Sequence, residues 1–334
     1  MILRFVLAAI LAIALTGCSG IQSALDPQGP HAKLLANLIW TFTAVCAVVW
    51  VLVVAVLFIA ILRPRGERTD PLLIDVPAER RAGSVIAVCA ALTAATVIGL
   101  TVLSYVAQRK LFAKDTAALI IKVTGHQWWW EVEYEDARPD RTFTTANEMH
   151  VPINAPVTVK LTSPDVIHSF WVPSIAGKMD LIPGQQNELQ FTVSRPGVYR
   201  GQCAEFCGLQ HAHMAMLVTA TSQEEFDSWR YSQRKPAEDP SDADTEKGRQ
   251  VFLSRSCVMC HTVRGTPAGS RVGPDLTHIA SRRYLAAGTL PISRGNLAAW
   301  IYDPQGIKPG ANMPHTELDA GELDALAGYM TVLK

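Results

Sequence analysis

The chain has 334 residues, a formal net charge of +0 at pH 7 and a hydrophobic fraction of 49%. This length allows two or more domains. A near-neutral total charge excludes the class of nucleic-acid binders that rely on bulk positive charge, so no nucleic-acid partner is expected.

Residues 1–17 are predicted to be an export signal. Arg4 supplies a short positive start, an apolar run follows, and small residues end the segment. The stretch "LTGC" resembles a bacterial lipoprotein cleavage box, which predicts Cys18 as the lipidated first residue of the mature chain. The alternative is a plain signal, or a first membrane helix that contains an unused cysteine.

Two longer apolar runs predict transmembrane helices at residues 33–63 and 82–107. Leu34–Leu62 and Ala82–Val106 contain no charged residue, and each exceeds the roughly 20 residues needed to span a bilayer. Buried helices of a soluble protein are the alternative. The segment between the runs contains Arg63, Arg65, Arg68, Arg80 and Arg81. Arginine marks the cytoplasmic side, so we expect a multi-pass protein of a bacterial inner membrane with its C-terminal domains on the periplasmic or extracellular side.

Residues 115–221 are predicted to form an all-β domain. Apolar residues alternate in "TVKLTS" and in "NELQFTV", which places two sets of side chains each on one face of a strand: Val157, Val159 and Leu161, and Leu189, Phe191 and Val193. Proline and glycine separate these segments. Short strands at this spacing favour an antiparallel sandwich or barrel.

A closing helix and a linker are predicted at residues 222–244, followed by a small all-α domain at 245–334. Ser222 and Glu225 form a potential capping box at the start of "SQEEFDSWRYSQ", and "RKPAEDPSDAD" is polar and contains prolines, as linkers do. Asp244 is the expected N-cap of the next helix. Asp319 and Glu322 predict a second capping box before the last helix.

The stretch "CAEFCGLQHAHM", residues 203–214, combines thiol, imidazole and thioether side chains. This combination favours copper over hard cations. Zinc is the alternative for a Cys/His set, but structural zinc sites have no use for a methionine. A disulfide is the default for paired cysteines in an exported chain, although it needs neither histidine nor methionine. Two thiolates on one loop could bridge two copper ions.

This stretch, with "DVIHSFWVP" and "GHQWWWEVEY", resembles the copper A domain of cytochrome c oxidase subunit II. That family has two membrane helices followed by a cupredoxin sandwich. The resemblance covers residues 30–225. It implies a dinuclear copper A site whose ligands are His168, Cys203, Glu205 through its backbone carbonyl, Cys207, His211 and Met214, with the two cysteines bridging both ions.

The resemblance implies further roles around the copper site. The Glu205 carboxylate would reach a magnesium or manganese ion at the border with subunit I, and Trp128 would lie at the electron-entry surface. Ordinary aromatic packing is the alternative for Trp128, Trp129 and Trp130. A neighbour such as Asp165 is expected to orient a histidine ligand. The Trp-Thr pair that often follows a glutamate near the second helix is missing, and Glu79 is more simply a solvated charge.

"CVMCH" at residues 257–261 is a C-x-x-C-H haem c attachment signature. Cys257 and Cys260 would form thioethers with the haem, and His261 would be an axial ligand. A C-x-x-C redox disulfide is the alternative, but it gives no reason for the histidine. Met313 is predicted as the sixth ligand, in a Pro/Gly-rich loop that resembles class I cytochromes c, as does "GPDL" at 273–276. The alternatives are Met259, Met330, His278 and His315, of which the last two are more simply surface residues.

Charge is distributed unevenly between the two domains. From Asp115 to Thr221 there are 11 acidic and 7 basic residues, a net charge of −4, and from Thr245 to Lys334 there are 7 acidic and 10 basic residues, a net charge of +3. Opposite patches can orient a tethered domain, although scattered solvating charges are the alternative.

The whole chain resembles subunit II of a caa-type oxidase, in which a cytochrome c domain follows the copper A domain. The resemblance implies electron transfer from haem c to copper A and on to subunit I, where O2 is reduced with proton pumping. Subunits I and III, and an exported cytochrome c or a bc-type complex as donor, are the implied partners. The alternatives are the electron-transfer subunit of a nitric-oxide-reducing enzyme and a membrane-tethered carrier or copper-handling protein without a catalytic partner.

Overall fold

The computed structural model describes residues 19–63, 76–113, 116 and 119–334. The predicted signal peptide and Cys18 lie outside the described residues, as do Arg65 and Arg68. The chain divides into two compact units, one of Leu34–Ala113 and one of Met1–Lys33 with Lys114–Lys334. Each unit is described by itself.

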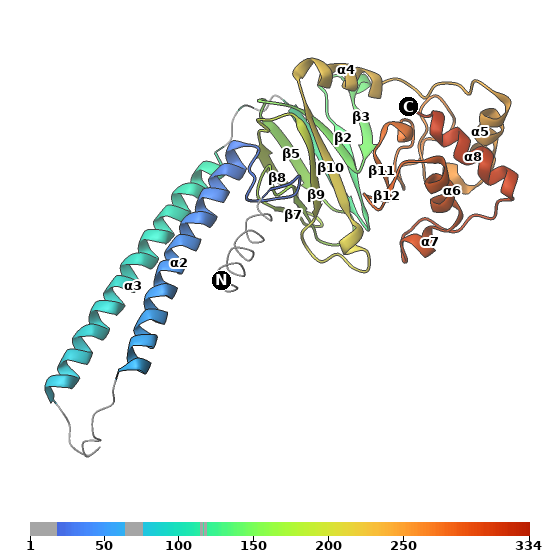
Figure 1. The fold of residues 1–334 in the computed structure, drawn as a ribbon. Coiled ribbons are helices and arrows are strands. Elements are labelled where there is room, and N and C mark those ends of the chain that lie inside the picture. The colour runs from blue at the N-terminus through green and yellow to red at the C-terminus, as the bar shows by residue number, and fades with distance from the viewer. Residues whose placement is uncertain (1–18, 64–75, 114–115, 117–118) are drawn as a thin grey trace, which may run out of the picture. The chain divides into compact units, whose positions relative to one another are not determined.

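The unit of Leu34–Ala113 contains two long helices, α2 (Pro30–Leu62) and α3 (Val76–Leu111) (Figure 1). The first residues of α2, up to Lys33, belong to the other unit. The most apolar windows of the two helices have mean hydropathies of 3.3 and 2.4, and none of the residues in these windows is buried within the protein. Both helices are long and apolar enough to cross a membrane. They extend beyond the apolar runs because Pro30 suits a first helical turn and the charged residues after Val76 are good helix formers.

The second unit contains a sandwich of two five-stranded sheets (Figure 1). One sheet has the order β3-β2-β1-β5-β8, and the other has the order β4-β10-β9-β6-β7. The strands are β1 (Leu119–His126), β2 (Trp129–Tyr134), β3 (Phe143–Ala146), β4 (Glu148–Pro152), β5 (Val157–Thr162), β6 (His168–Trp171), β7 (Met179–Leu181), β8 (Asn187–Phe191), β9 (Gly197–Cys203) and β10 (Ala215–Thr221).

The sheets are mixed, so the expectation of a purely antiparallel sandwich is wrong. β1 pairs in parallel with β5, and β4 pairs in parallel with β10. The physical reason lies in the connections. The chain passes from β3 in one sheet to β4 in the other and then returns to lie beside β1 as β5, and a strand that returns in this way arrives in the original direction.

The core lies between the two sheets, and the predicted alternation is confirmed in full for β5, whereas Leu189 of β8 is only half-buried. Val157, Val159 and Leu161 are fully buried on one face of β5, and Phe191 and Val193 are fully buried at and beyond the end of β8. Strands β1, β2 and β5 bury every second side chain in this way.

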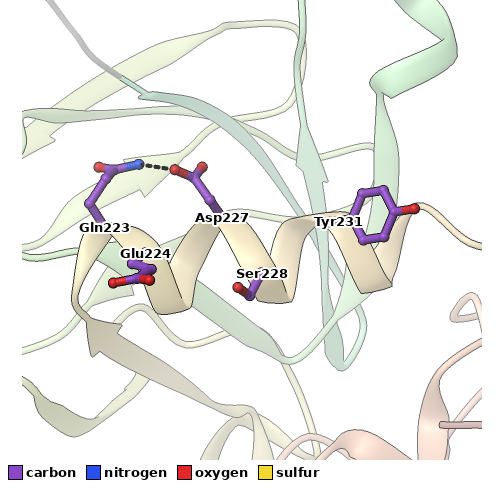
Figure 2. A pocket seen from close by; sticks show the side chains of 5 residues that line it. All are labelled: Gln223, Glu224, Asp227, Ser228 and Tyr231. Atoms are coloured by element: carbon purple, nitrogen blue, oxygen red, sulfur yellow. Dashed lines mark hydrogen bonds between the residues drawn. The ribbon is translucent and has the colours of Figure 1, made fainter.

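Helix α4 (Gln223–Gln233) closes the sandwich, with the predicted capping box of Ser222 and Glu225. Phe226 is buried, and Trp229 stacks on the ring of His150 in β4 at 4.1 Å. A shallow hollow follows the outer face of α4, where only exposed residues line it (Figure 2): Gln223, Glu224, Asp227, Ser228 and Tyr231. None of the predicted ligand residues lies there.

The C-terminal part is a small helical domain, as the helical pattern of its sequence predicted. Its elements are α5 (Ala243–Ser254), α6 (Arg294–Tyr302), α7 (Pro304–Ile307), α8 (Ala320–Val332) and a short hairpin of β11 (Tyr284–Leu285) and β12 (Leu290–Pro291). Short 3-10 turns lie at Ser256–Met259 and Ile279–Ser281. Phe252 on α5 and Leu326, Tyr329 and Met330 on α8 are buried in its core.

Helix starts in this domain are confirmed in one case and wrong in the other. Asp319 and Glu322 form the predicted capping box of α8. The N-cap of α5 is Asp242 rather than Asp244, because the Asp242 carboxylate accepts a hydrogen bond of 2.8 Å from the backbone N–H of Thr245. Both aspartates suit an N-cap. Asp242 is the N-cap because its side chain reaches the backbone N–H three residues later, that of Thr245.

Candidate metal centre and haem-binding residues

Three neighbouring strands position the candidate copper ligands. Cys203 ends β9 and Ala215 begins β10, so the copper loop, residues 203–214, connects two antiparallel neighbours. β6 pairs with the other side of β9, and Phe170 of β6 lies directly across from Cys203. His168 begins β6, and this arrangement brings its ring to the base of the loop.

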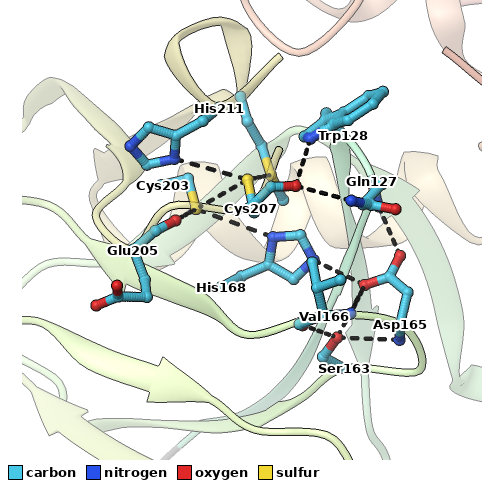
Figure 3. Close-up of polar contacts among 11 residues, drawn as sticks. Gln127, Trp128, Ser163, Asp165, Val166, His168, Cys203, Glu205, Cys207 and His211 are labelled. Carbon is cyan, nitrogen blue, oxygen red and sulfur yellow. Dashed lines mark hydrogen bonds and ion pairs between the residues drawn. The ribbon is translucent and has the colours of Figure 1, made fainter. Parts of the chain in front are cut away.

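The donor atoms of this cluster lie close together (Figure 3). Cys203 Sγ lies 3.7 Å from Cys207 Sγ and 3.9 Å from His168 Nδ1. Cys207 Sγ lies 3.6 Å from His211 Nδ1 and 3.9 Å from the Met214 sulfur. His168, Cys203, Cys207 and Met214 are buried, and His211 is half-buried.

The donor set fits copper, and Cys203 and Cys207 are free thiols in this structure. A disulfide requires a sulfur–sulfur distance of about 2.05 Å, and the 3.7 Å between Cys203 and Cys207 is far longer. The hydrogen bond between the two thiols lowers the pKa of one of them, Cys203. One thiol of the pair is therefore ready to ionise, as metal binding requires. Two soft sulfurs, two imidazoles and a thioether form a set that selects copper.

Asp165 holds the ring of His168 in place, as expected from the sequence. The Asp165 carboxylate lies 2.8 Å from His168 Nε2 and accepts hydrogen bonds from the backbone N–H groups of Val166 and Gln127 at 2.6 and 2.7 Å. Burial raises the pKa of Asp165, but these hydrogen bonds outweigh it and bring the pKa to about 2. An ionised carboxylate on Nε2 leaves Nδ1 directed at the thiols, which is how second partners orient metal-bound histidines.

The backbone carbonyl and the side-chain carboxylate of Glu205 lie in different surroundings. Its carbonyl oxygen lies 3.2 Å from Cys203 Sγ, within the cluster. Its carboxylate is exposed and lies 3.4 Å from the ammonium group of Lys178. The structure thus gives the backbone carbonyl a position inside the cluster and pairs the carboxylate with a surface lysine that the sequence analysis did not single out.

The three consecutive tryptophans have three different environments. Trp130 is fully buried and packs edge-on against Phe170, which confirms aromatic packing for one of them. Trp129 stacks on His126 at 4.5 Å. Trp128 is buried, and its indole N–H donates to the carbonyl oxygen of Cys207 at 2.8 Å. Only Trp128 contacts the copper loop through a hydrogen bond.

The haem-attachment residues lie in the 3-10 turn Ser256–Met259 and just after it. Cys257 and Cys260 are half-buried free thiols. His261 donates from Nδ1 to the carbonyl oxygen of Pro274 at 2.8 Å, which leaves Nε2 available for a metal. Burial lowers the pKa of His261 and so favours its neutral form. Gly273 is required here, since a Cβ at this position would lie 2.8 Å from the His261 ring. The donor set therefore fits a c-type haem.

The candidate sixth ligands of the haem differ in their burial and in their hydrogen-bond partners. Met330 is buried in the helical core and Met259 is 70% exposed. His278 is buried, so its interpretation as a surface residue is wrong. Its two ring nitrogens contact the carbonyl oxygens of Lys334 and Lys235. Met313 is half-buried, with its backbone carbonyl held by the Gln305 amide at 2.9 Å.

Lys308 is a residue of this region that the sequence analysis missed. It is 2% exposed, and its ammonium group donates to the carbonyl oxygens of Trp128 at 2.7 Å and His213 at 2.8 Å, both next to the copper cluster. Burial lowers the pKa of Lys308 to about 7. A lysine between isoleucine and proline carries no local sign of burial, because its acceptors come from distant parts of the chain.

Among the residues that the structure describes, an ion-pair cluster joins the two domains. Arg271 lies 2.8 Å from Glu131 and 2.6 Å from Glu133. Hydrogen bonding to these two carboxylates raises the pKa of Arg271. Arg271 is 60% exposed, so this cluster is weak and sensitive to salt.

Comparison with known proteins extends these observations to the whole chain. Residues 136–221 match the family described as "Cytochrome C oxidase subunit II, periplasmic domain", and residues 245–334 match the family "Cytochrome c". The "Cytochrome c oxidase subunit 2" of Bacillus subtilis is 34% identical over 233 residues, which cover 66% of this chain and 64% of that protein. The solved periplasmic domain of subunit II of cytochrome oxidase (CoxB) of Bradyrhizobium japonicum is 36% identical and covers 36% of this chain and 96% of its own, with a TM-score of 0.33.

One relative matches from end to end. The "Cytochrome c oxidase subunit 2" of Alkalihalophilus pseudofirmus is 33% identical over 341 residues, which cover 99% of this chain and 97% of that protein. This match includes the two apolar helices, the β-sandwich and the helical C-terminal domain. The chain belongs to the cytochrome c oxidase subunit II family, in a form with a fused C-terminal cytochrome c domain.

Proposed function

We propose that this subunit passes electrons from a haem c in its C-terminal domain to a dinuclear copper A centre in its β-sandwich, and from there to subunit I. Subunit I would reduce O2 to water and pump protons. Membership of an oxidase subunit family supports the overall role and favours it over nitric oxide reduction. When bound, haem c and copper A supply one-electron redox chemistry, the first as acceptor from an external donor and the second as donor to subunit I.

The proposed copper A ligands are the residues whose donor atoms form the buried cluster: His168, Cys203, the carbonyl of Glu205, Cys207, His211 and Met214. The sheet beneath them fixes their positions, and Asp165 fixes the ring of His168. A centre held by a stiff scaffold needs little rearrangement when its charge changes.

The proposed haem c ligands are His261 and Met313, with Cys257 and Cys260 as attachment points. Three observations support this set. His261 keeps Nε2 free while Nδ1 is held by Pro274, and Met330 and His278 are committed to the domain core. Ligation by histidine and methionine raises the haem potential relative to two histidines, which suits a donor to copper.

The single observation that carries the electron path is the position of Trp128. Its indole N–H donates to the carbonyl oxygen of Cys207, its ring lies near Gly310, and its own carbonyl accepts from Lys308. A Cβ on Gly310 would lie 3.4 Å from the Trp128 ring. Residues just before the proposed haem ligand Met313 thus contact the tryptophan that is hydrogen-bonded to a proposed copper ligand. We propose Trp128 as the entry point for electrons.

The proposed assembly follows from these roles. The chain would bind subunit I and subunit III in a bacterial inner membrane and take electrons from an exported cytochrome c or a bc-type complex. The Glu205 carboxylate, now paired with Lys178, would instead reach a magnesium or manganese ion at the border with subunit I.

The purified native complex provides the test. We expect two copper ions and one covalent haem per subunit, a near-infrared band from the copper pair, and ascorbate-driven oxygen uptake. Trp128→Phe removes the hydrogen bond to Cys207 and should slow electron transfer from haem to copper about tenfold while both spectra persist. Trp129→Phe is the matched control. A complex with one copper per subunit, or with equal rates in the two variants, would overturn the proposed path.

A further inference from the structure

Lys308 is a buried cation at the end of α7, with no carboxylate among its hydrogen-bond partners. All three of its N–H donors have acceptors: the carbonyl oxygens of Trp128 at 2.7 Å, His213 at 2.8 Å and Ala286 at 3.1 Å. Buried lysines are rare because the charge loses its hydration. Three carbonyl oxygens replace that hydration here, which uses the full donor capacity of an ammonium group.

Two of these three acceptors belong to the copper-binding domain. The first is on Trp128, whose indole contacts Cys207, and the second is on His213, the residue before Met214. The third acceptor, Ala286, lies in the turn between β11 and β12 of the cytochrome c domain. The ammonium group therefore joins the backbones of the two domains beside the candidate copper ligands.

Other hydrogen bonds between the domains surround Lys308. The amide of Gln210 in the copper loop donates to the carbonyl of Pro309 at 2.8 Å. The backbone N–H of Ala215 donates to the carbonyl of Ala287 at 2.9 Å, and the N–H of Arg283 donates to the buried carboxylate of Glu148. These directional bonds converge on one face of the cytochrome c domain, so they define an orientation and not merely a contact.

The weaker contact between the domains is of a different kind. Arg271 pairs with Glu131 and Glu133 at the surface, where water and salt screen the attraction. Such a pair can attract the domains but does not fix their orientation. A buried ammonium group with three acceptors restricts the orientation much more strongly, because any rotation of the domain would leave buried N–H donors unpaired.

We propose that Lys308 is the positioning residue that holds the cytochrome c domain on the copper-binding domain in one orientation, with residues 308–313 against Trp128. A role confined to its own domain would need acceptors there, and only Ala286 is one. The consequence for electron transfer rests on the proposed function: transfer from haem to copper would occur within one docked arrangement and would not wait for a domain movement.

Hydrogen exchange in the full subunit, within the purified complex, tests this directly. The amides of Ala215 and Arg283 donate across the domain boundary, so their protection reports docking. Lys308→Met should speed exchange at both amides about tenfold or more. The amides of β5, inside the sandwich, should keep wild-type exchange. Lys247→Met removes an exposed lysine of the same domain and should change nothing.

Internal electron transfer gives the second readout. After rapid photoreduction of the haem, the wild-type rate should not depend on solvent viscosity, and the Lys308→Met rate should be lower and should fall as viscosity rises. Lys308→Gln keeps two N–H donors without the charge, so its electron-transfer rate should lie between those of wild type and Lys308→Met. If Lys308→Met does not assemble, Lys308→Gln is the variant that tests the positioning role.

The outcomes separate the two proposals. Wild-type exchange at Ala215 and Arg283 in an assembled Lys308 variant would overturn the positioning role, whatever the redox data show. An intact wild-type complex without any transfer from haem to copper would overturn the electron path, while faster exchange in the variant would still support the positioning role.

Discussion

The copper loop and the haem-attachment segment show two ways of fixing a redox group. The proposed copper donors are mostly buried and lie at the ends of β6 and β9 and in the loop that joins β9 to β10, with neighbouring donor atoms between 3.2 and 3.9 Å apart. The haem residues lie on a short 3-10 turn and on an irregular loop. Small ions without covalent attachment depend on the scaffold for their geometry. A c-type haem would be held by thioether bonds to Cys257 and Cys260, so its proposed axial ligands could lie on less regular structure.

The largest expected effect tests the dependence of copper on the scaffold. Cys207→Ser should remove the copper pair, because a hydroxyl cannot replace a bridging thiolate. Metal analysis should show loss of both copper ions, with the near-infrared band and oxygen uptake abolished and the haem c band retained. Cys89→Ser, in a membrane helix, is the control and should retain both coppers. Two coppers in Cys207→Ser would contradict the bridging role.

The matching change on the haem side should be more selective. Met313→Ala should leave the haem covalently attached through Cys257 and Cys260 but abolish the methionine-ligated low-spin spectrum and lower the potential. Met259→Ala removes an exposed methionine and should leave the spectrum unchanged. If the low-spin spectrum persists in Met313→Ala, a different residue is the sixth ligand.

A smaller effect is expected from the residue that orients His168. Asp165→Asn keeps the size of the side chain but removes the charge that holds the imidazole through Nε2. Copper affinity should fall by roughly 10- to 100-fold, as measured by competition with a chelator. Asp140→Asn, at an exposed ion pair, should leave the affinity unchanged, and an equal affinity in both variants would show that the strands alone position the ring.

The smallest effect concerns the sandwich itself and its response to acid. Burial lowers the pKa of His150 to about 4 from an ordinary value of 6.5, so the unfolded chain binds more protons between these two values. The contribution of neutral His150 to stability is therefore complete above pH 6.5 and is lost as the pH falls toward 4.

His150→Phe keeps the stacking on Trp229 and should remove about 3 kcal/mol of this pH dependence. The measurement is thermal unfolding of the purified complex at several pH values, followed through the copper band. His315→Phe, at an exposed position, is the control. The same slope in wild type and His150→Phe between pH 4 and 6.5 would contradict the assignment.

The sequence predicted local features well because they depend on residues close together in the chain. Alternation in β5 placed Val157, Val159 and Leu161 in the core, and the capping boxes at Ser222 and Asp319 are present. Where two equivalent residues competed for one role, as Asp242 and Asp244 did for the N-cap of α5, the sequence offered no means of choosing.

Features that depend on distant segments could not be derived in the same way. The parallel pairing of β1 with β5 follows from how the chain moves between the sheets. His278 is buried because the last residues of the chain and the linker converge on it. Neither arrangement leaves a pattern in the neighbouring residues.

The order of residues along the chain was enough to predict which chemistry to expect: soft ligands in "CAEFCGLQHAHM", a haem signature in "CVMCH" and two apolar runs long enough for a membrane. Ligand type, spacing within one loop and length of an apolar segment are local properties. The contact of Lys308 in one domain with Trp128 in the other, and of Trp128 with Cys207, exists only in the folded protein. That arrangement depends on backbone carbonyls and on a surface between domains, and side-chain identity along the chain does not encode either one locally.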